Sequence, residues 1–132
     1  MINTNELMLG NWVEYATGIN GDKRSIPMYV KAIFRDEVYL DFEGNDGDVW
    51  EEKEENLLGI PITEELLEKC GFKKIEGERS YRIDDAVIIY GVPSTKCWMI
   101  RMFAFGKIPV FDIHELQNAY FMLTNKHLEV KL

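Results

Sequence analysis

The chain has 132 residues, of which 46% are hydrophobic and 29% are charged, and its net charge is −8. This length suits one domain, or two small lobes that share a core. No apolar run approaches the ~20 residues of a membrane span, and Met1–Trp12 lacks the basic and apolar regions of an export signal. We therefore expect a cytoplasmic protein with no membrane contact, in which Cys70 and Cys97 are free thiols rather than a disulfide.

Most of the negative charge lies in one segment. Residues 36–56 contain ten acidic side chains and one basic side chain, whereas the rest of the chain carries a net charge of +1. Affinity for nucleic acid comes from neutralising phosphates, so this segment disfavours nucleic acid and favours a basic protein surface as its partner. The alternative interpretation is a solvated face that keeps the protein soluble.

Short runs of alternating apolar residues predict a β-rich N-terminal part. The five expected strands lie at residues 12–15, 26–35, 38–43, 49–51 and 57–60, separated by a loop at 17–25 and by tight turns. The side chains expected to face the core in the second and third strands are Met28, Val30, Ala32, Phe34, Val38, Leu40 and Phe42. Five short strands in about sixty residues predict an SH3-like small β-barrel at residues 1–62, because curling a sheet protects its edges.

A short helix is predicted from Thr63 to Gly71. Thr63 can cap its N-terminus, and Gly71 can adopt the left-handed conformation that ends a helix. Phe72 can then fold back onto Leu67. Four strands are expected to follow, at residues 72–75, 80–83, 86–90 and 97–105. The last two are apolar on both faces, so they require cover on both sides.

A second helix is predicted to begin at Asp112. Asp112 and Glu115 form a capping-box pattern, and apolar residues follow at spacings of three and four. These apolar residues are Ile113, Leu116, Tyr120 and Leu123. A final strand is expected at residues 128–132. The predicted fold is α+β: the SH3-like barrel at 1–62 is joined by the short helix to an antiparallel sheet packed on a C-terminal helix at 63–132, and both parts share one core.

One spacing on the second helix is typical of zinc chemistry but is incomplete. His114 and Glu115 begin the helical zinc-protease pattern, in which two histidines one turn apart bind the metal. Asn118 stands where the second histidine belongs, so we expect His114 to be a surface residue. No nucleophile with a histidine base and no phosphate-binding glycine loop is recognisable. The sequence therefore predicts no catalytic residue.

A calcium-loop spacing in the acidic segment is also incomplete. Oxygen-bearing side chains at residues 41, 43, 45 and 52 fall at the first, third, fifth and twelfth positions of such a loop. The sharp-turn glycine is displaced to Gly47, with Asp46 in its place, and the flanking residues favour strands over helices. We expect an acidic hairpin, and the sequence predicts neither a metal site nor a cofactor.

Aromatic side chains near the acidic segment form a candidate binding surface. In a small barrel, exposed aromatic residues can line a groove for a peptide, although most aromatic residues of a small domain are core. We expect a non-enzymatic interaction protein that uses these aromatic residues or the acidic segment to contact a basic protein partner. The candidate partner-binding residues are Trp12, Tyr39, Trp50, Glu51, Glu52, Glu54 and Glu55.

A nucleic-acid-associated barrel protein is the second hypothesis. Its contacts would come from a basic cluster downstream of the acidic segment, among which Glu76 and Glu78 also lie. The basic cluster comprises Lys69, Lys73, Lys74, Arg79 and Arg82. An enzyme of unidentified type ranks third, because it needs a concave polar pocket that a sequence does not display. The strands that are apolar on both faces also favour a homodimer.

Three segments together carry a recognisable pattern. They are Asn5-Glu6-Leu7 with Gly10-Asn11-Trp12-Val13, then Ile60 to Leu67 with Gly71-Phe72, and finally His114 to Asn118 with Tyr120, Phe121, Leu123 and Thr124. In this order and spacing the chain resembles a family of short uncharacterised proteins of Bacteroides-type bacteria, often encoded among prophage or mobile-element genes. The resemblance spans nearly the whole chain and implies a genomic setting, with no catalytic residues to transfer.

Overall fold

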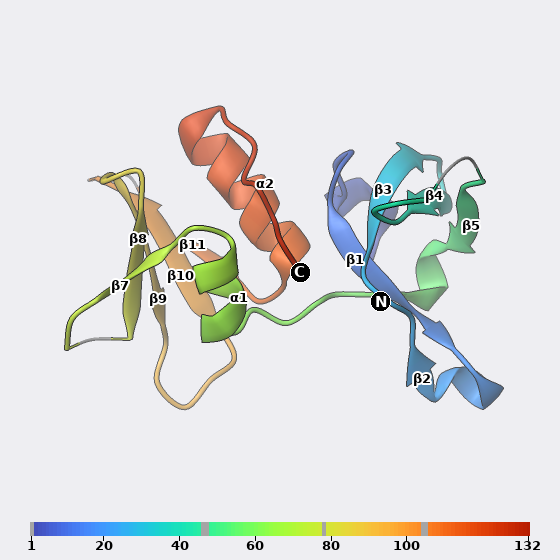
Figure 1. The fold of residues 1–132 in the computed structure, drawn as a ribbon, viewed down its shortest axis with the longest axis horizontal. Helices are drawn as coiled ribbons and strands as arrows, with labels where there is room; N and C mark the ends of the chain where they lie inside the picture. Colours follow the sequence, from blue (N-terminus) through green and yellow to red (C-terminus); the bar gives the residue numbers. More distant parts are fainter. Residues whose placement is uncertain (1, 46–47, 78, 104–105) are drawn as a thin grey trace. The chain divides into compact units, whose positions relative to one another are not determined.

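The computed structural model describes residues 2–45, 48–77, 79–103 and 106–132. The chain divides into two compact units, Met1–Ile60 and Pro61–Leu132, which are called unit 1 and unit 2 below. Both units are built on antiparallel β-sheet, and unit 2 also contains the long C-terminal helix (Figure 1). The fold is therefore α+β, as the sequence predicts.

Unit 1 is a six-stranded antiparallel sheet with the strand order β2-β1-β3-β4-β5, and β6 also pairs with β1. Its strands are β1 (Trp12–Thr17), β2 (Lys23–Arg24), β3 (Met28–Ile33), β4 (Glu37–Asp41), β5 (Trp50–Lys53) and β6 (Leu57–Leu58). Three short 3₁₀ helices are η1 (Thr4–Glu6), η2 (Ile19–Gly21) and η3 (Glu54–Asn56). The five strands expected from the sequence are present, and the expected loop at 17–25 also contains η2 and β2.

A β-bulge in β3 changes which side chains enter the core of unit 1. The register shifts after Val30, so Ile33 packs against the core and Phe34 is 45% exposed. This corrects the expectation that Ala32 and Phe34 face inward. Phe42 is exposed as well, because β4 ends before it. The described core comprises Ile2, Leu7, Val13, Met28, Val30, Val38, Leu40 and Leu57.

Unit 2 contains a five-stranded antiparallel sheet with the order β11-β10-β9-β8-β7. Its strands are β7 (Lys73–Ile75), β8 (Ser80–Ile83), β9 (Val87–Gly91), β10 (Trp98–Met102) and β11 (Ile108–Val110). The four expected strands are present, but β10 ends at Met102, because Phe103 has a left-handed backbone with φ +51°. Ala104 and Phe105, which the expected strand included, lie outside the described residues. The sequence does not predict β11, since three residues with a central proline carry no alternation signal.

The first helix, α1 (Glu64–Lys69), has the ends that the sequence predicts. The hydroxyl of Thr63 accepts a hydrogen bond from the backbone N–H of Leu66 at 3.1 Å. At the other end Gly71 has φ +96°, and the N–H of Phe72 donates to the carbonyl of Leu67 at 3.0 Å. Leu67 is fully buried. The predicted fold-back of Phe72 onto Leu67 is therefore confirmed at the backbone level.

The second helix, α2 (Ile113–Thr124), begins with the predicted capping box. The Asp112 side chain accepts from the N–H of Glu115, and the Glu115 carboxylate accepts from the N–H of Asp112 at 3.1 Å. Ile113 and Leu116 are fully buried, as the apolar stripe predicts. The expectation that His114 lies at the surface is wrong, because this side chain is 1% exposed. Ile113 and Leu116 are buried beside it, so the buried face at the start of α2 is wide enough to include His114.

The sheet of unit 2 is buried on one face and half-exposed on the other. Opposite residues of neighbouring strands share a face, so the register separates the two sets of side chains. Helix α2 packs against β10 and β11. The buried set is Tyr81, Val87, Ile89, Trp98 and Ile100, and the half-exposed apolar set is Ile88, Tyr90 and Met99. The sequence led us to expect that both faces of these strands are covered. Within this unit, one face is fully buried and the other is half-exposed.

Three further expectations concern the chain as a whole. Residues 128–132 form no strand, although Leu128 is buried. Cys70 is buried and Cys97 is half-buried, and both are free thiols. Within the described ranges, no helix combines the length and the apolar character that crossing a membrane requires.

Candidate functional site

Tyr15 of β1 and Trp50 of β5 stack on each other in unit 1. Their ring centroids are 5.6 Å apart and their planes differ by 10°. Tyr15 packs against the core, whereas Trp50 is 50% exposed. Because β5 ends the strand order of the sheet, Trp50 presents an aromatic surface to solvent at the sheet edge, and Tyr15 holds it from the other side.

The carboxylate of Glu52 is fixed beside the stacked rings. Its Oε2 accepts a hydrogen bond from the indole Nε1 of Trp50 at 2.9 Å, and its Oε1 accepts one from Nδ2 of Asn56 at 2.7 Å. We call Tyr15, Trp50, Glu52 and Asn56 the Trp50 site. A carboxylate has about four lone-pair positions, so Glu52 can accept further hydrogen bonds from a ligand. A fixed carboxylate next to an exposed aromatic surface is a combination suited to a cation.

Negative charge near the sheet edge acts on two tyrosines. Burial and, second, the carboxylate of Glu52 raise the pKa of the Tyr15 phenol above its ordinary value. The pKa of Tyr39 is also raised, chiefly by the neighbouring carboxylate of Glu51. Both shifts favour the neutral form of the phenol, which can donate a hydrogen bond.

The strand register places two of the predicted acidic residues on opposite sides of the sheet. Trp50 lies opposite the buried Leu40, so its side chain and that of Glu52 leave β5 on the core side. Glu51 lies opposite Tyr39 and leaves β5 on the other side. Of the acidic residues expected to bind a partner, Glu52 is thus the one that the structure brings to Trp50.

The acidic residues of η3 have different roles. The carboxylate of Glu54 accepts a hydrogen bond from the backbone N–H of Thr4 at 2.9 Å, which ties η3 to the N-terminal η1. Glu55 is exposed. Glu54 therefore links η3 to η1, while Glu55 adds negative charge at the surface next to the Trp50 site.

Trp12 and Tyr39 lie in other aromatic pairs rather than beside Trp50. The rings of Trp12 and Tyr29 meet edge to face, with centroids 5.4 Å apart. The rings of Phe34 and Tyr39 are 4.9 Å apart. The three aromatic residues that the sequence offered for one groove therefore belong to three different pairs.

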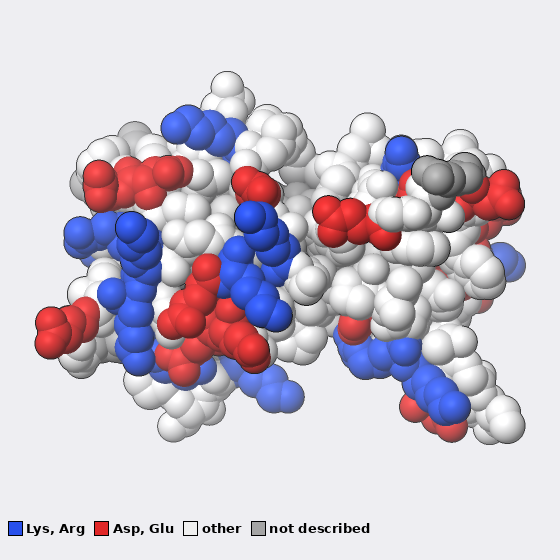
Figure 2. All heavy atoms as spheres, in the orientation of Figure 1, with Lys and Arg blue, Asp and Glu red and all other residues white. Residues whose placement is uncertain are grey.

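Sequence reasoning missed two members of the Trp50 site, Tyr15 and Asn56. A signal for Tyr15 exists, because it lies two residues after the buried Val13 and so shares its face of β1. No comparable signal marks Asn56, whose role depends on the path of η3. In Figure 2 acidic side chains lie at the edge of unit 1 around the position of β5, in agreement with the charge count of this segment.

The basic cluster of the second hypothesis is spread over unit 2. Lys73 and Arg82 lie directly opposite each other across β7 and β8. Asp84 and Asp85 line the same small cavity as these two side chains and offset their charge.

The other members of the basic cluster lie elsewhere in unit 2. The guanidinium of Arg79 lies over the ring of Trp98, 4.6 Å from its centroid. Figure 2 shows basic and acidic side chains intermingled on the visible face of this unit. The remaining two members, Lys69 and Lys74, are exposed.

Two of the four oxygen-bearing residues of the calcium-loop spacing, Asp41 and Asn45, serve the turn after β4. Asp41 is buried, and its Oδ1 accepts hydrogen bonds from the N–H of Phe42 and from Nδ2 of Asn45. These bonds, led by that of Asn45, lower the pKa of the Asp41 carboxyl. Asp46 and Gly47 lie outside the described residues. Among the residues that are described, no group of three or more His, Cys, Asp and Glu side chains is arranged to hold a metal ion.

Comparison of the chain with protein-family models, curated proteins and solved structures found no match. The resemblance of the three sequence segments to short proteins of Bacteroides-type bacteria stays a prediction.

Proposed function

We propose that the chain is a non-enzymatic protein-interaction module whose Trp50 site binds an arginine-containing basic segment of a partner protein. The observation that carries the proposal is the half-exposed indole of Trp50, stacked on Tyr15 and bonded to the fixed carboxylate of Glu52. An aromatic ring held in place at a sheet edge is an anchor of the kind found at the centre of binding surfaces.

The charge of the segment supports a basic occupant for the site. Residues 36–56 carry a net charge of −9, which attracts a basic segment and raises its rate of encounter. A guanidinium can lie flat on the exposed indole of Trp50 while its N–H groups donate to Glu52. An ammonium group lacks the planar fork, so we expect arginine to bind more tightly than lysine.

The strand pairing supports the finer fold assignment that the sequence suggested. The last strand, β6, pairs with the first strand, β1, directly after the 3₁₀ helix η3. Such pairing of first and last strands is what closing a small barrel requires. We propose on this basis that unit 1 is an SH3-like barrel, with the Trp50 site at the rim formed by β1, β5 and η3.

A peptide titration tests the proposed function. Fluorescently labelled tetra-arginine, tetra-lysine and tetra-glutamine are titrated with the whole chain, at low and at high ionic strength, and binding is followed by anisotropy. We expect the order arginine, lysine, glutamine, with affinity that falls as salt rises. Trp50→Ala should weaken tetra-arginine binding about tenfold or more, as loss of an anchor residue does.

Charge variants distinguish binding of tetra-arginine at the Trp50 site from its general attraction to the negatively charged chain. Reversal of Glu51, Glu52 and Glu55 to lysine should abolish tetra-arginine binding, and Glu54, whose carboxylate accepts the N–H of Thr4, is left in place. The matched control removes two acids from unit 2, with Glu65→Gln and Glu68→Gln on α1, and should leave binding almost unchanged. Equal losses in the control and in a Glu52→Gln, Glu55→Gln double variant would refute the Trp50 site as the binding surface.

Nucleic-acid binding remains the second candidate, favoured by one feature of unit 2. Lys73, Arg82 and Arg101 lie in one row across β7 to β10 on the half-exposed face of the sheet, with Ile88 of β9 between the two arginines. Salt-dependent retention of the chain on single-stranded nucleic acid, lost in a Lys73→Gln, Arg82→Gln variant, would support this candidate. The expected homodimer is a separate question, and sedimentation of the chain at several concentrations tests whether two copies associate.

A further inference from the structure

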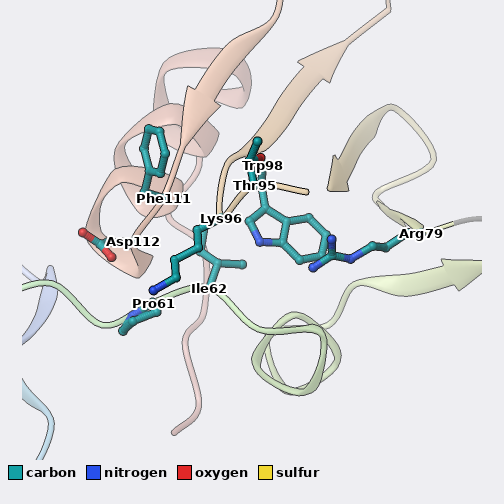
Figure 3. A pocket seen from close by; sticks show the side chains of 8 residues that line it. All are labelled: Pro61, Ile62, Arg79, Thr95, Lys96, Trp98, Phe111 and Asp112. Carbon is teal, nitrogen blue, oxygen red and sulfur yellow. The ribbon is translucent and has the colours of Figure 1, made fainter. Parts of the chain in front are cut away.

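Unit 2 contains a pocket of about 460 Å³ next to the start of α2 (Figure 3). Its volume is within the range of pockets that hold small molecules. The pocket combines apolar side chains with charged ones of both signs. The lining includes Pro61, Ile62, Arg79, Lys96, Trp98 and Asp112, and we call this cavity the Trp98 pocket.

Arg79 lies over the ring of Trp98, in space that Gly91 leaves free. Its guanidinium carbon is 4.6 Å from the ring centroid, and Figure 3 shows the guanidinium lying across the indole. The N–H of Gly91 donates to the carbonyl of Arg79 at 3.2 Å. A Cβ atom at Gly91 would lie 2.9 Å from the guanidinium carbon, so the absence of a side chain at Gly91 leaves the room that Arg79 occupies. Trp98 itself is 2% exposed and is therefore a fixed support.

The charge of the pocket is unbalanced toward the positive. Arg79 and Lys96 are both exposed, and no described acidic residue forms an ion pair with either of them. The one acidic lining residue, Asp112, accepts the N–H of Glu115 in the capping box of α2. In Figure 3 the side chain of Lys96 runs past Ile62 toward Pro61, on the side of the pocket away from Arg79.

We propose that the Trp98 pocket binds a small organic carboxylate, with its carboxylate on Arg79 and its apolar body against Ile62 and Pro61. A guanidinium over an indole ring can keep its N–H edge directed sideways, and this edge matches a carboxylate through two parallel hydrogen bonds. Lys96 adds positive potential at the rim of the pocket. This site is separate from the Trp50 site, and the proposal does not depend on the proposed function.

Three probe compounds of nearly equal size test the ligand class. Benzoate, benzyl alcohol and benzylamine are titrated into the ¹⁵N-labelled chain, and the indole Nε1 resonance of Trp98 is followed by NMR. We expect benzoate to shift this resonance to saturation and the two other compounds to leave it almost unchanged. Equal shifts by benzoate and benzyl alcohol would overturn the assignment to an anion, and tighter binding of inorganic phosphate than of benzoate would overturn the assignment to a carboxylate.

Variants of the pocket test the role of Arg79. Arg79→Gln should weaken benzoate binding about tenfold or more, the loss expected for a hydrogen-bonded charge. Gly91→Ala keeps every charge but displaces the guanidinium from the indole, so it should weaken binding to a similar extent while the protein unfolds at nearly the native temperature. Lys107→Gln, a matched loss of one cation at another place in unit 2, should change nothing. Unchanged affinity in Arg79→Gln, or equal losses in Lys107→Gln and Arg79→Gln, would refute the proposal.

Discussion

Replacing Glu52 by glutamine tests how the Trp50 site is held together. The native carboxylate accepts one hydrogen bond from Trp50 and one from Asn56. Glutamine has nearly the same shape but only one acceptor oxygen, so either Trp50 or Asn56 must face its amide N–H₂ group. A lost hydrogen bond to a charged group costs about 1.5–3 kcal/mol in a buried site, and because this site is half-buried we expect about 1 kcal/mol.

The same substitution should also change the titration of Tyr15. Burial and then Glu52 raise the pKa of this phenol, so Glu52→Gln should lower that pKa part of the way and leave the share that burial contributes. The assay is an NMR titration of ¹³Cζ-labelled tyrosine, with Tyr15→Phe to assign the resonance. Urea unfolding of the same samples gives the change in the free energy of unfolding.

Glu55→Gln is the matched control, since it removes the same charge from an exposed position of η3. We expect it to change the free energy of unfolding by less than about 0.5 kcal/mol and to leave the titration of Tyr15 almost as it is. An unchanged pKa of Tyr15 in Glu52→Gln, together with native stability, would show that Glu52 does not hold the aromatic pair and would refute the reasoning.

Three further predictions concern unit 2. Asp112→Ala should lower the free energy of unfolding by about 1 kcal/mol through loss of the cap of α2, whereas Asp112→Asn should keep most of the stability that the cap contributes. Thermal unfolding of both variants measures the difference. Gly71→Ala should cost about 1 kcal/mol, because φ +96° suits glycine, and urea unfolding measures it against the native chain. Burial, with hydrogen bonds to Glu64 and Asp84 respectively, raises the pKa of Tyr81 and that of Tyr120 from 10.0 to about 12. Because each phenol keeps its proton to higher pH in the folded protein than in the unfolded chain, the free energy of unfolding should fall as pH rises from about 10 toward 12. Tyr81→Phe and Tyr120→Phe should each flatten that slope, and an unchanged slope in both would contradict the assignment.

The elements that the sequence predicts well are those whose signals are local. The caps at Thr63 and Asp112 depend on residues within one turn, and both form as expected. The bulge in β3 depends on pairing with β4, which alternation alone does not encode, and it reverses the expected positions of Ile33 and Phe34. Likewise, the burial of His114 depends on what packs around the start of α2.

The candidate site was predictable in its chemistry and not in its geometry. The concentration of acidic residues with Trp50 pointed to the part of unit 1 in which the structure places the Trp50 site. The choice of Glu52 over Glu51 follows from the register of β5 against β4, which places them on opposite sides of the sheet. The hydrogen bond from the N–H of Thr4 to the carboxylate of Glu54 joins residues fifty positions apart, and no local sequence pattern indicates this bond.

Assignment of the three indole Nε1 resonances, followed by titration of the whole chain with tetra-arginine, tests the central claim most directly. If the Trp50 site binds a basic segment, the resonance of Trp50 shifts to saturation while that of Trp98 stays in place, and Trp50→Ala weakens binding. A titration that shifts no indole resonance, or that shifts the resonances of Trp50 and Trp98 equally, would contradict the account.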